Sequence, residues 1–150
     1  MQGRSFRSIL IGNTPPDWRQ ATYYRYWMHR AHHDVPAHYG IRTKRYKLIF
    51  FYGRALHPRS NEIWANSTES HDAKQLHKVS GWGKQPPEST PASFELYDLE
   101  KDPYEMRNVY GQPEYEALAK ELKKQLLKLK FDIGDTDDTY PELTKLFHSR

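Results

Sequence analysis

The chain has 150 residues, a length that suits one domain with a single hydrophobic core. Its net charge of +4 permits an anionic partner, although the 23 basic and 19 acidic residues are largely interspersed. No apolar run is long enough for a membrane span, and the absence of Cys excludes disulfides and thiolate metal sites.

Residues 1–20 are predicted to form an incoming linker. Gly3, Gly12 and the Asn13–Pro16 cluster punctuate this stretch, and two successive prolines favour extended backbone over helix.

Four segments are predicted to be strands of an antiparallel sheet, because they are dense in aromatic and β-branched side chains. They are Ala21–Met28, His38–Thr43, Tyr46–Tyr52 and Ser93–Leu99. Only Lys44 and Arg45 separate the second strand from the third, which predicts a hairpin. This pair lacks the glycine typical of a tight turn, so the register of the hairpin stays open.

Residues 53–92 separate the third and fourth strands and are rich in Pro, Ser, His, Lys and Asn. Connections inside a compact domain are usually shorter than roughly 15 residues. We therefore expect a long loop or insertion here, either with a short helix near residues 70–79 or partly disordered.

The clearest helix signal runs from Pro113 to about Phe131, followed by Gly134 as a stop signal. Apolar side chains recur on one face at helical spacing: Tyr115, Leu118, Ala119, Leu122, Leu126 and Leu129. This face is expected to pack on the sheet, which gives an α+β fold with a four-stranded antiparallel sheet covered on one face by a long C-terminal helix. Residues 135–150 are predicted to be a poorly anchored tail.

Three phrases along the chain resemble, in order, the C-terminal subdomain of the sulfatases. They are DWRQATYYRYW, VPAHYGIRTKRYKLIFFY and FELYDLEKDPYEMRNVY. The phrases are most similar to bacterial sulfatases of the heparan sulfamidase, iduronate-sulfatase and N-acetylglucosamine-6-sulfatase type. By this resemblance residues 21–134 are the subdomain, and residues 1–20 lead in from a catalytic domain that is missing from the chain.

In that family the N-terminal domain binds calcium, carries formylglycine and cleaves the sulfate ester. The C-terminal subdomain packs beside it and helps to shape the substrate cleft. The resemblance therefore implies two partners, the catalytic domain and a sulfated glycan, and a periplasmic or extracellular location.

No residue of this chain is predicted to be catalytic. Formylglycine is made from a Cys or Ser within a C/S-x-P-S-R type motif, and the chain has no Cys and no Ser that opens such a motif. It also lacks the Asp/Asn-rich strand that would hold calcium through oxygen ligands. We expect the chain alone to be inactive and assign it no metal and no cofactor.

Five residues are predicted to contact substrate: Arg25, His29, His33, His38 and Arg42. The Arg42 guanidinium could make bidentate hydrogen bonds to a sulfate or carboxylate. The alternative is a structural ion pair with an acidic group of the neighbouring domain. Alternation along the strand places His38, Gly40 and Arg42 on one face, so His38 and Arg42 would act together if that face lined the cleft.

The histidines His29, His32 and His33 lie in a loop-like stretch before Pro36. A metal site is disfavoured because no carboxylate or second ligand cluster follows at a regular spacing, so His29 or His33 is expected to bond a sugar hydroxyl. Arg25 sits among Tyr23, Tyr24, Tyr26 and Trp27. Such a strand could stack on sugar rings or on bases, but the pattern is more typical of a strand that is half core and half interface.

The alternative function is a freestanding basic module that binds an anionic polysaccharide or nucleic acid, although no nucleic-acid motif is recognised. A self-contained hydrolase would need a nucleophile motif, which is lacking. Loss of the catalytic partner would leave an apolar patch, so the chain alone is expected to self-associate.

Overall fold

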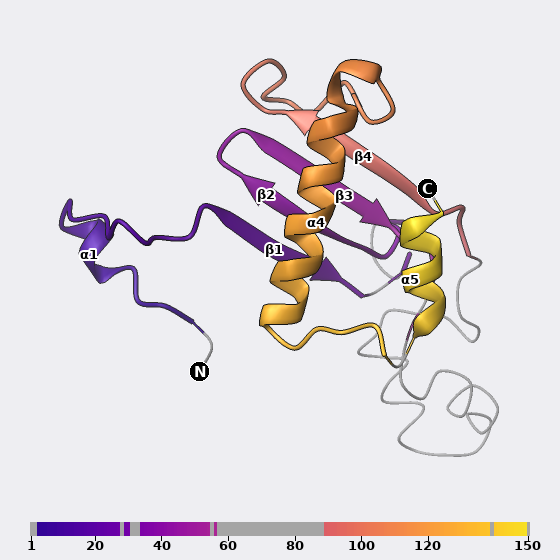
Figure 1. The fold of residues 1–150 in the computed structure, drawn as a ribbon, viewed down its shortest axis with the longest axis horizontal. Coiled ribbons are helices and arrows are strands. Elements are labelled where there is room, and N and C mark those ends of the chain that lie inside the picture. The colour runs from indigo at the N-terminus through magenta and orange to yellow at the C-terminus, as the bar shows by residue number, and fades with distance from the viewer. Residues whose placement is uncertain are drawn as a thin grey trace.

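A computed structural model of the chain describes residues 3–27, 29–30, 34–54, 56, 89–138 and 140–149. Figure 1 shows a four-stranded sheet crossed on one face by two helices, with an N-terminal arm that leads away from the sheet. The elements are α1 (Arg7–Leu10), β1 (Ala21–Tyr26), β2 (His38–Thr43), β3 (Tyr46–Phe51), β4 (Ser93–Asp98), the 3-10 turn η1 (Pro113–Tyr115), α4 (Glu116–Asp132) and α5 (Pro141–His148).

The strand order is β1-β2-β3-β4 and every neighbouring pair is antiparallel, which confirms the predicted α+β fold. The hairpin of β2 and β3 has a two-residue loop, so Arg42 pairs with Lys47 in the register. Thr43 closes this turn without a glycine: its hydroxyl accepts the Tyr46 N–H at 2.8 Å and lies 3.1 Å from the Tyr46 carbonyl.

The outer edge of β4 is covered by the chain that follows it. The Asn108 side chain accepts the Leu96 N–H at 2.9 Å, and the Val109 N–H donates to the Leu96 carbonyl at 2.9 Å. These bonds satisfy backbone groups that an edge strand would otherwise offer to another chain.

The helix α4 packs its apolar face on the sheet, as the periodicity predicted. Ala119, Leu122 and Leu126 are buried against the strands. Gly134 ends the helix in the left-handed region, at φ 74°, and its N–H donates to the Phe131 carbonyl while the Asp135 N–H reaches the Lys130 carbonyl. This pair of bonds is the Schellman arrangement, which confirms the predicted stop.

The predicted tail at residues 135–150 was wrong, because Pro141–His148 forms the helix α5. Leu143 is 0% exposed and Phe147 is 1% exposed. The Phe147 ring stacks on Tyr39 at 6.0 Å between ring centroids and meets Phe50 and Phe94 edge to face, both at 5.2 Å. The helix therefore completes the core beside α4 (Figure 1).

The long connection between β3 and β4 leaves and rejoins the sheet at one point. The Thr90 N–H donates to the Gly53 carbonyl at 2.7 Å. Residues 55 and 57–88 lie outside the described residues, and so does the short helix predicted near residues 70–79.

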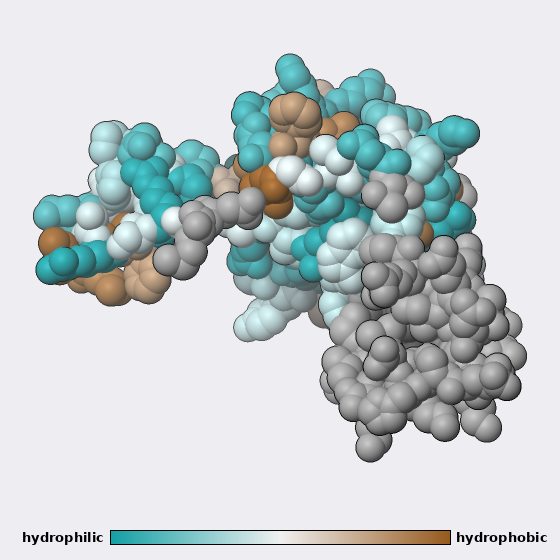
Figure 2. Space-filling view, turned by 90° about the horizontal axis from the view of Figure 1, so that it is seen from below, coloured by the Kyte–Doolittle hydropathy of each residue, from teal (hydrophilic) through white to brown (hydrophobic). Residues whose placement is uncertain are grey.

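The arm of residues 3–20 carries exposed apolar side chains. Phe6 is 59% exposed, Leu10 73% and Ile11 69%, and Figure 2 shows hydrophobic surface on the arm as it projects from the body. A single ion pair, Arg4 with Asp17 at 2.7 Å, braces the arm. Across the described part of the chain, no helix has the length and apolar character needed to cross a membrane.

Candidate functional site

The two faces of the sheet differ in what covers them. One face lies under α4 and α5, and we call the other the open face (Figure 1). Because side chains alternate along a strand, the register defines its members. They are Thr22, Tyr24 and Tyr26 of β1, His38, Gly40 and Arg42 of β2, Lys47, Ile49 and Phe51 of β3, and Ser93, Glu95 and Tyr97 of β4.

His38 lies at the aromatic end of the open face. Its ring centroid is 5.0 Å from that of Phe51, 5.5 Å from Tyr26 and 6.1 Å from Tyr24. Its Nδ1 is 2.8 Å from the carbonyl of Pro36. A carbonyl only accepts, so Nδ1 carries the proton and Nε2 is the nitrogen left to accept a bond from a ligand or a neighbouring domain.

Arg42 lies at the charged end of the same face, directly opposite Lys47. Like charges that face each other across two strands destabilise a sheet. Glu105 offsets this repulsion, because its carboxylate accepts a hydrogen bond from the Lys47 ammonium and lies 3.7 Å from the Arg42 guanidinium. Glu105 has a left-handed φ of 56°, which is strained for a residue with a side chain. The turn after β4 thus positions this carboxylate at the cost of backbone strain.

Gly40 separates the two ends of the open face. A Cβ at this position would lie 2.6 Å from the Tyr24 hydroxyl, so the Tyr24 ring can lie across the strand only because Gly40 has no side chain. Burial, with the nearby Glu105 carboxylate, raises the pKa of Tyr24. His38 and Arg42 are four residues apart, about 13 Å along an extended strand, so they share a face but cannot hold the same small group.

Arg25 lies on the helix-covered face, in a buried ion cluster. Its Nη1 is 2.7 Å from Asp135 and 3.4 Å from Asp137, and the Lys130 ammonium bonds Asp137 at 2.9 Å. The Arg25 side chain is only 4% exposed, and its guanidinium lies 3.4 Å from the centroid of the Trp27 ring. The two cations and two carboxylates tie β1 to the connection between α4 and α5.

Burial shifts the pKa of groups in and beside the ion cluster. Burial lowers the pKa of Lys130, and the hydrogen bond that its ammonium donates to the Asp137 carboxylate opposes that shift. Burial also raises the pKa of the Tyr23 hydroxyl, which donates to the Asp135 carboxylate and is held protonated by it. Every charge of the cluster thus has a partner within the chain, and its chemistry is that of a structural clamp.

His29 is fully buried in the loop after β1. Its Nδ1 accepts the Ala37 N–H at 3.1 Å, so the imidazole braces the chain between β1 and β2. His33 lies outside the described residues. Of the four predicted contact residues that the structure describes, His38 and Arg42 share the open face. Where side chains are described, no group of three or more His, Asp or Glu could hold a metal ion.

The prediction from sequence missed Lys47 and Glu105 as partners of Arg42. Lys47 had a usable signal, because a two-residue loop between β2 and β3 places it opposite Arg42 by counting alone. Glu105 had none, since its position depends on how the turn after β4 folds back over the sheet.

The fold is thus an α+β domain with an open sheet face that is aromatic at one end and charged at the other. The chain matches the family model described as N-sulphoglucosamine sulphohydrolase, C-terminal, over residues 1–82 and 88–132. The chain belongs to this family of sulfatase C-terminal domains.

Two similar proteins agree with this membership. An N-acetylglucosamine-6-O-sulfatase of Bacteroides thetaiotaomicron is 34% identical over 149 residues, which cover 98% of this chain and 20% of the relative. A solved structure of a protein in complex with its substrate, D-glucosamine-2-N,6-O-disulfate, is 32% identical with a TM-score of 0.62. That match covers 93% of this chain and 21% of the solved one. The chain thus spans about a fifth of the length of these relatives.

Proposed function

We propose that this chain is the non-catalytic C-terminal subdomain of a sulfatase that acts on sulfated glycans, in the manner of an N-sulfoglucosamine sulfohydrolase. The observation that carries the proposal is the coverage: the match takes in 98% of this chain but only 20% of the relative. The chain has no Cys, and none of its serines opens a formylglycine motif. Calcium and formylglycine belong, in this proposal, to a catalytic domain outside the chain, in a periplasmic or extracellular enzyme of glycosaminoglycan degradation.

The distribution of exposed apolar side chains supports docking at one end of the sheet. The start of β1, the hairpin of β2 and β3, and the end of β4 share that end, because Ala21 pairs with Thr43 and Tyr46 with Asp98. The arm enters there and the turn after β4 leaves there. Of the eight exposed large apolar side chains described, five belong to these two segments: Phe6, Leu10, Ile11, Tyr104 and Met106.

We call this group of five side chains the arm end. Tyr104 and Met106 are both 84% exposed, on either side of the strained Glu105. The three arm residues and the two turn residues form two separate exposed apolar groups, and each is a candidate for contact with another protein. The catalytic domain docks, in this proposal, on the arm end and the adjoining open face.

The open face then has two roles. The aromatic end around His38 supplies packing surface for the catalytic domain. Arg42 is 56% exposed and lies beside the arm end, where its guanidinium holds either a substrate sulfate or a carboxylate of the catalytic domain. In this way the subdomain helps to shape the cleft without supplying a reacting group.

The first test is the mass of the native product, detected in its source cells with an antibody raised against this chain. A species several times heavier than 17.8 kDa supports a sulfatase with a separate catalytic domain. A species of 17.8 kDa contradicts the proposal and favours the freestanding basic module.

The second test separates the two roles of Arg42 in the whole protein. Arg42→Ala is expected to raise KM for a sulfated glucosamine roughly tenfold with little change in kcat if Arg42 holds the substrate sulfate. If it holds the catalytic domain instead, the unfolding temperature falls and KM stays constant. Lys44→Ala, on the exposed hairpin loop, is the matched control. Hydrolysis of a sulfate ester by the 150-residue chain alone would overturn the non-catalytic role.

A further inference from the structure

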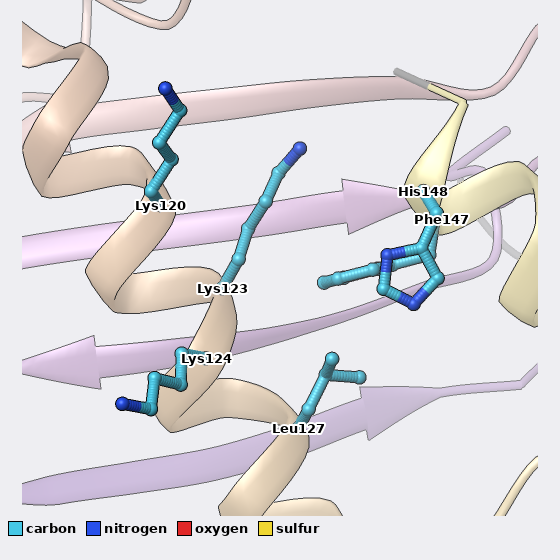
Figure 3. Close-up of a pocket in the computed structure, with 6 residues that line it drawn as sticks. All are labelled: Lys120, Lys123, Lys124, Leu127, Phe147 and His148. Atoms are coloured by element: carbon cyan, nitrogen blue, oxygen red, sulfur yellow. The ribbon is translucent and has the colours of Figure 1, made fainter.

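We infer that a second binding site, for the sulfate groups of a glycan chain, lies between α4 and α5 on the helix side of the sheet. The inference rests on the proposed function for the class of its ligand. The site is an open groove of 340 Å³, which we call the lysine groove (Figure 3). Its lining residues are Lys120, Lys123, Lys124 and Leu127 of α4 and Phe147 and His148 of α5.

The period of α4 brings the three lysines together. Lys120, Lys123 and Lys124 stand at positions i, i+3 and i+4, which share one side of a helix. Figure 3 shows them on the α4 side of the groove, with Phe147 and His148 across from them on α5. Two separate elements therefore build the site, and it exists only because α5 folds onto the sheet.

Aromatic rings order the central lysine. The Lys123 ammonium is 3.9 Å from the ring centroid of Phe94, 5.2 Å from that of Tyr110 and 5.6 Å from that of Phe147. Cation–π attraction to these rings holds the side chain in one region of the groove. An ammonium that is already positioned costs less conformational entropy when it binds an anion.

The charge of the groove selects an anion. Among the described residues that line the groove there is no carboxylate. Of the three groove lysines, Lys120 is paired with Glu116 at 2.8 Å, whereas Asp132 pairs with Lys128, which does not line the groove. Sulfate esters and sulfamates stay ionised at all physiological pH values, so the lysines attract them. The three side chains diverge in Figure 3, where the Lys124 ammonium points away from α5.

A sulfated glycan fits this groove better than a nucleic acid does. Single-stranded nucleic acids bind by stacking bases on exposed aromatic rings. Of the two rings that line the groove, Phe147 is 1% exposed and packed in the core, so only the exposed imidazole of His148 is left for a base to stack on. Leu127 offers an apolar contact to a sugar ring, while the lysines meet its sulfates. The site would hold a polymeric substrate at a distance from the reacting bond.

The test measures binding of heparin oligosaccharides to the 150-residue chain as a function of salt. Lys124→Gln and the double variant Lys123→Gln/Lys124→Gln are expected to weaken binding roughly fivefold for each lysine removed. The control Arg7→Gln/Lys44→Gln removes the same charge from exposed positions outside the groove and is expected to leave affinity within about twofold. Thermal unfolding of each variant checks that the fold is kept, and Lys124→Gln serves alone if the double variant unfolds.

Several outcomes would overturn the inference. Equal losses in the control variant would show that heparin binds by net charge alone. Equal binding of desulfated heparin would remove sulfate as the ligand, and tighter binding of single-stranded DNA would assign the groove to nucleic acid. In the whole protein, the double variant is expected to lose turnover on polymer and keep turnover on a sulfated monosaccharide. Absence of turnover on both substrates in the unaltered protein would count against the proposed function, whereas the binding result stands separately.

Discussion

Gly40 sets the shape of the open face because a ring and a backbone atom occupy the space of its missing side chain. A Cβ there would lie 2.6 Å from both the Tyr24 hydroxyl and the Leu48 carbonyl. Tyr24 can move aside, but the carbonyl of a neighbouring strand cannot. Gly40→Ala is therefore expected to lower the free energy of unfolding by about 1–3 kcal/mol. Gly3→Ala, with nothing within 4 Å of the new Cβ, is the control for urea unfolding. An unchanged midpoint in Gly40→Ala would contradict this account.

Substitutions at two glycines with left-handed φ distinguish the cost of backbone strain from the cost of a steric clash. Gly134 has φ 74° and open space around it, so Gly134→Ala is expected to cost about 1 kcal/mol from backbone strain alone. Gly53 has φ 64°, and a Cβ there would lie 2.2 Å from the Thr90 carbonyl oxygen. Gly53→Ala is therefore expected to cost about 2–4 kcal/mol. Equal unfolding midpoints for the two variants would show that Thr90 gives way.

Asp98 makes stability depend on pH. Its carboxylate is 2% exposed and accepts two bonds from Arg45, at 3.0 and 2.8 Å, and this pairing lowers the pKa of Asp98. A carboxyl with a folded pKa below its unfolded value contributes stability above the unfolded pKa, near 3.9, and loses it as the pH falls through the folded pKa. Asp98→Asn is expected to cost about 1 kcal/mol at pH 7, at the low end because Arg45 is 38% exposed. The cost is expected to shrink as the pH falls toward the folded pKa of Asp98.

Unfolding curves of Asp98→Asn at pH 7 and pH 2 test this prediction. Asp17→Asn removes the exposed pair with Arg4 and is expected to change neither curve. A penalty of Asp98→Asn that persists at low pH would mean that the carboxylate charge is not its cause.

The side of the sheet on which a residue lies could be predicted from strand alternation. An ion-pair partner far along the chain could not be predicted. Strand alternation alone placed His38, Gly40 and Arg42 on one face. Arg25 was assigned to substrate, yet its partner Asp135 lies 110 residues away in the chain. No pattern within β1 indicates that pairing, and residues 135–150 had been predicted to be a tail.

Among the elements, the strands and α4 were predictable because each has a clear period. Their bounds differ from the predicted ones by two residues at most, apart from the 3-10 turn that opens the long helix. The helix α5 has only eight residues, too few for a local signal to outweigh the acidic stretch before it. Its stability comes from burial of Leu143 and Phe147, which depends on the tertiary structure.

Removal of the Phe147 ring tests how far α5 supports the core. Phe147→Ala is expected to lower the free energy of unfolding by about 3–5 kcal/mol, because the ring contacts Tyr39, Phe50 and Phe94. Leu146→Ala, at a half-buried position of the same helix, is expected to cost less than half as much. Similar costs for the two variants, measured by calorimetry, would mean that α5 is held by helix propensity rather than by the core.

For the whole molecule, the arm end predicts self-association of the isolated chain. Its exposed apolar side chains would find each other in the absence of a catalytic domain. Sedimentation equilibrium at high concentration is expected to show dimers or larger species, and Leu10→Ser/Ile11→Ser is expected to weaken association at least about tenfold. Phe131→Ser, also exposed at 74% but on α4, is the control. A strict monomer in the unaltered chain would contradict the prediction.

Because the Thr90 N–H bonds the Gly53 carbonyl, the connection between β3 and β4 can change in length without changing the register of the strands. Since the chain leaves β3 and returns to β4 at this one closed point, residues gained or lost between them need not shift any cross-strand pair. The entropy of closing such a connection grows only slowly with its length. A reporter sequence inserted between residues 54 and 89 is therefore expected to leave the sheet pairing intact.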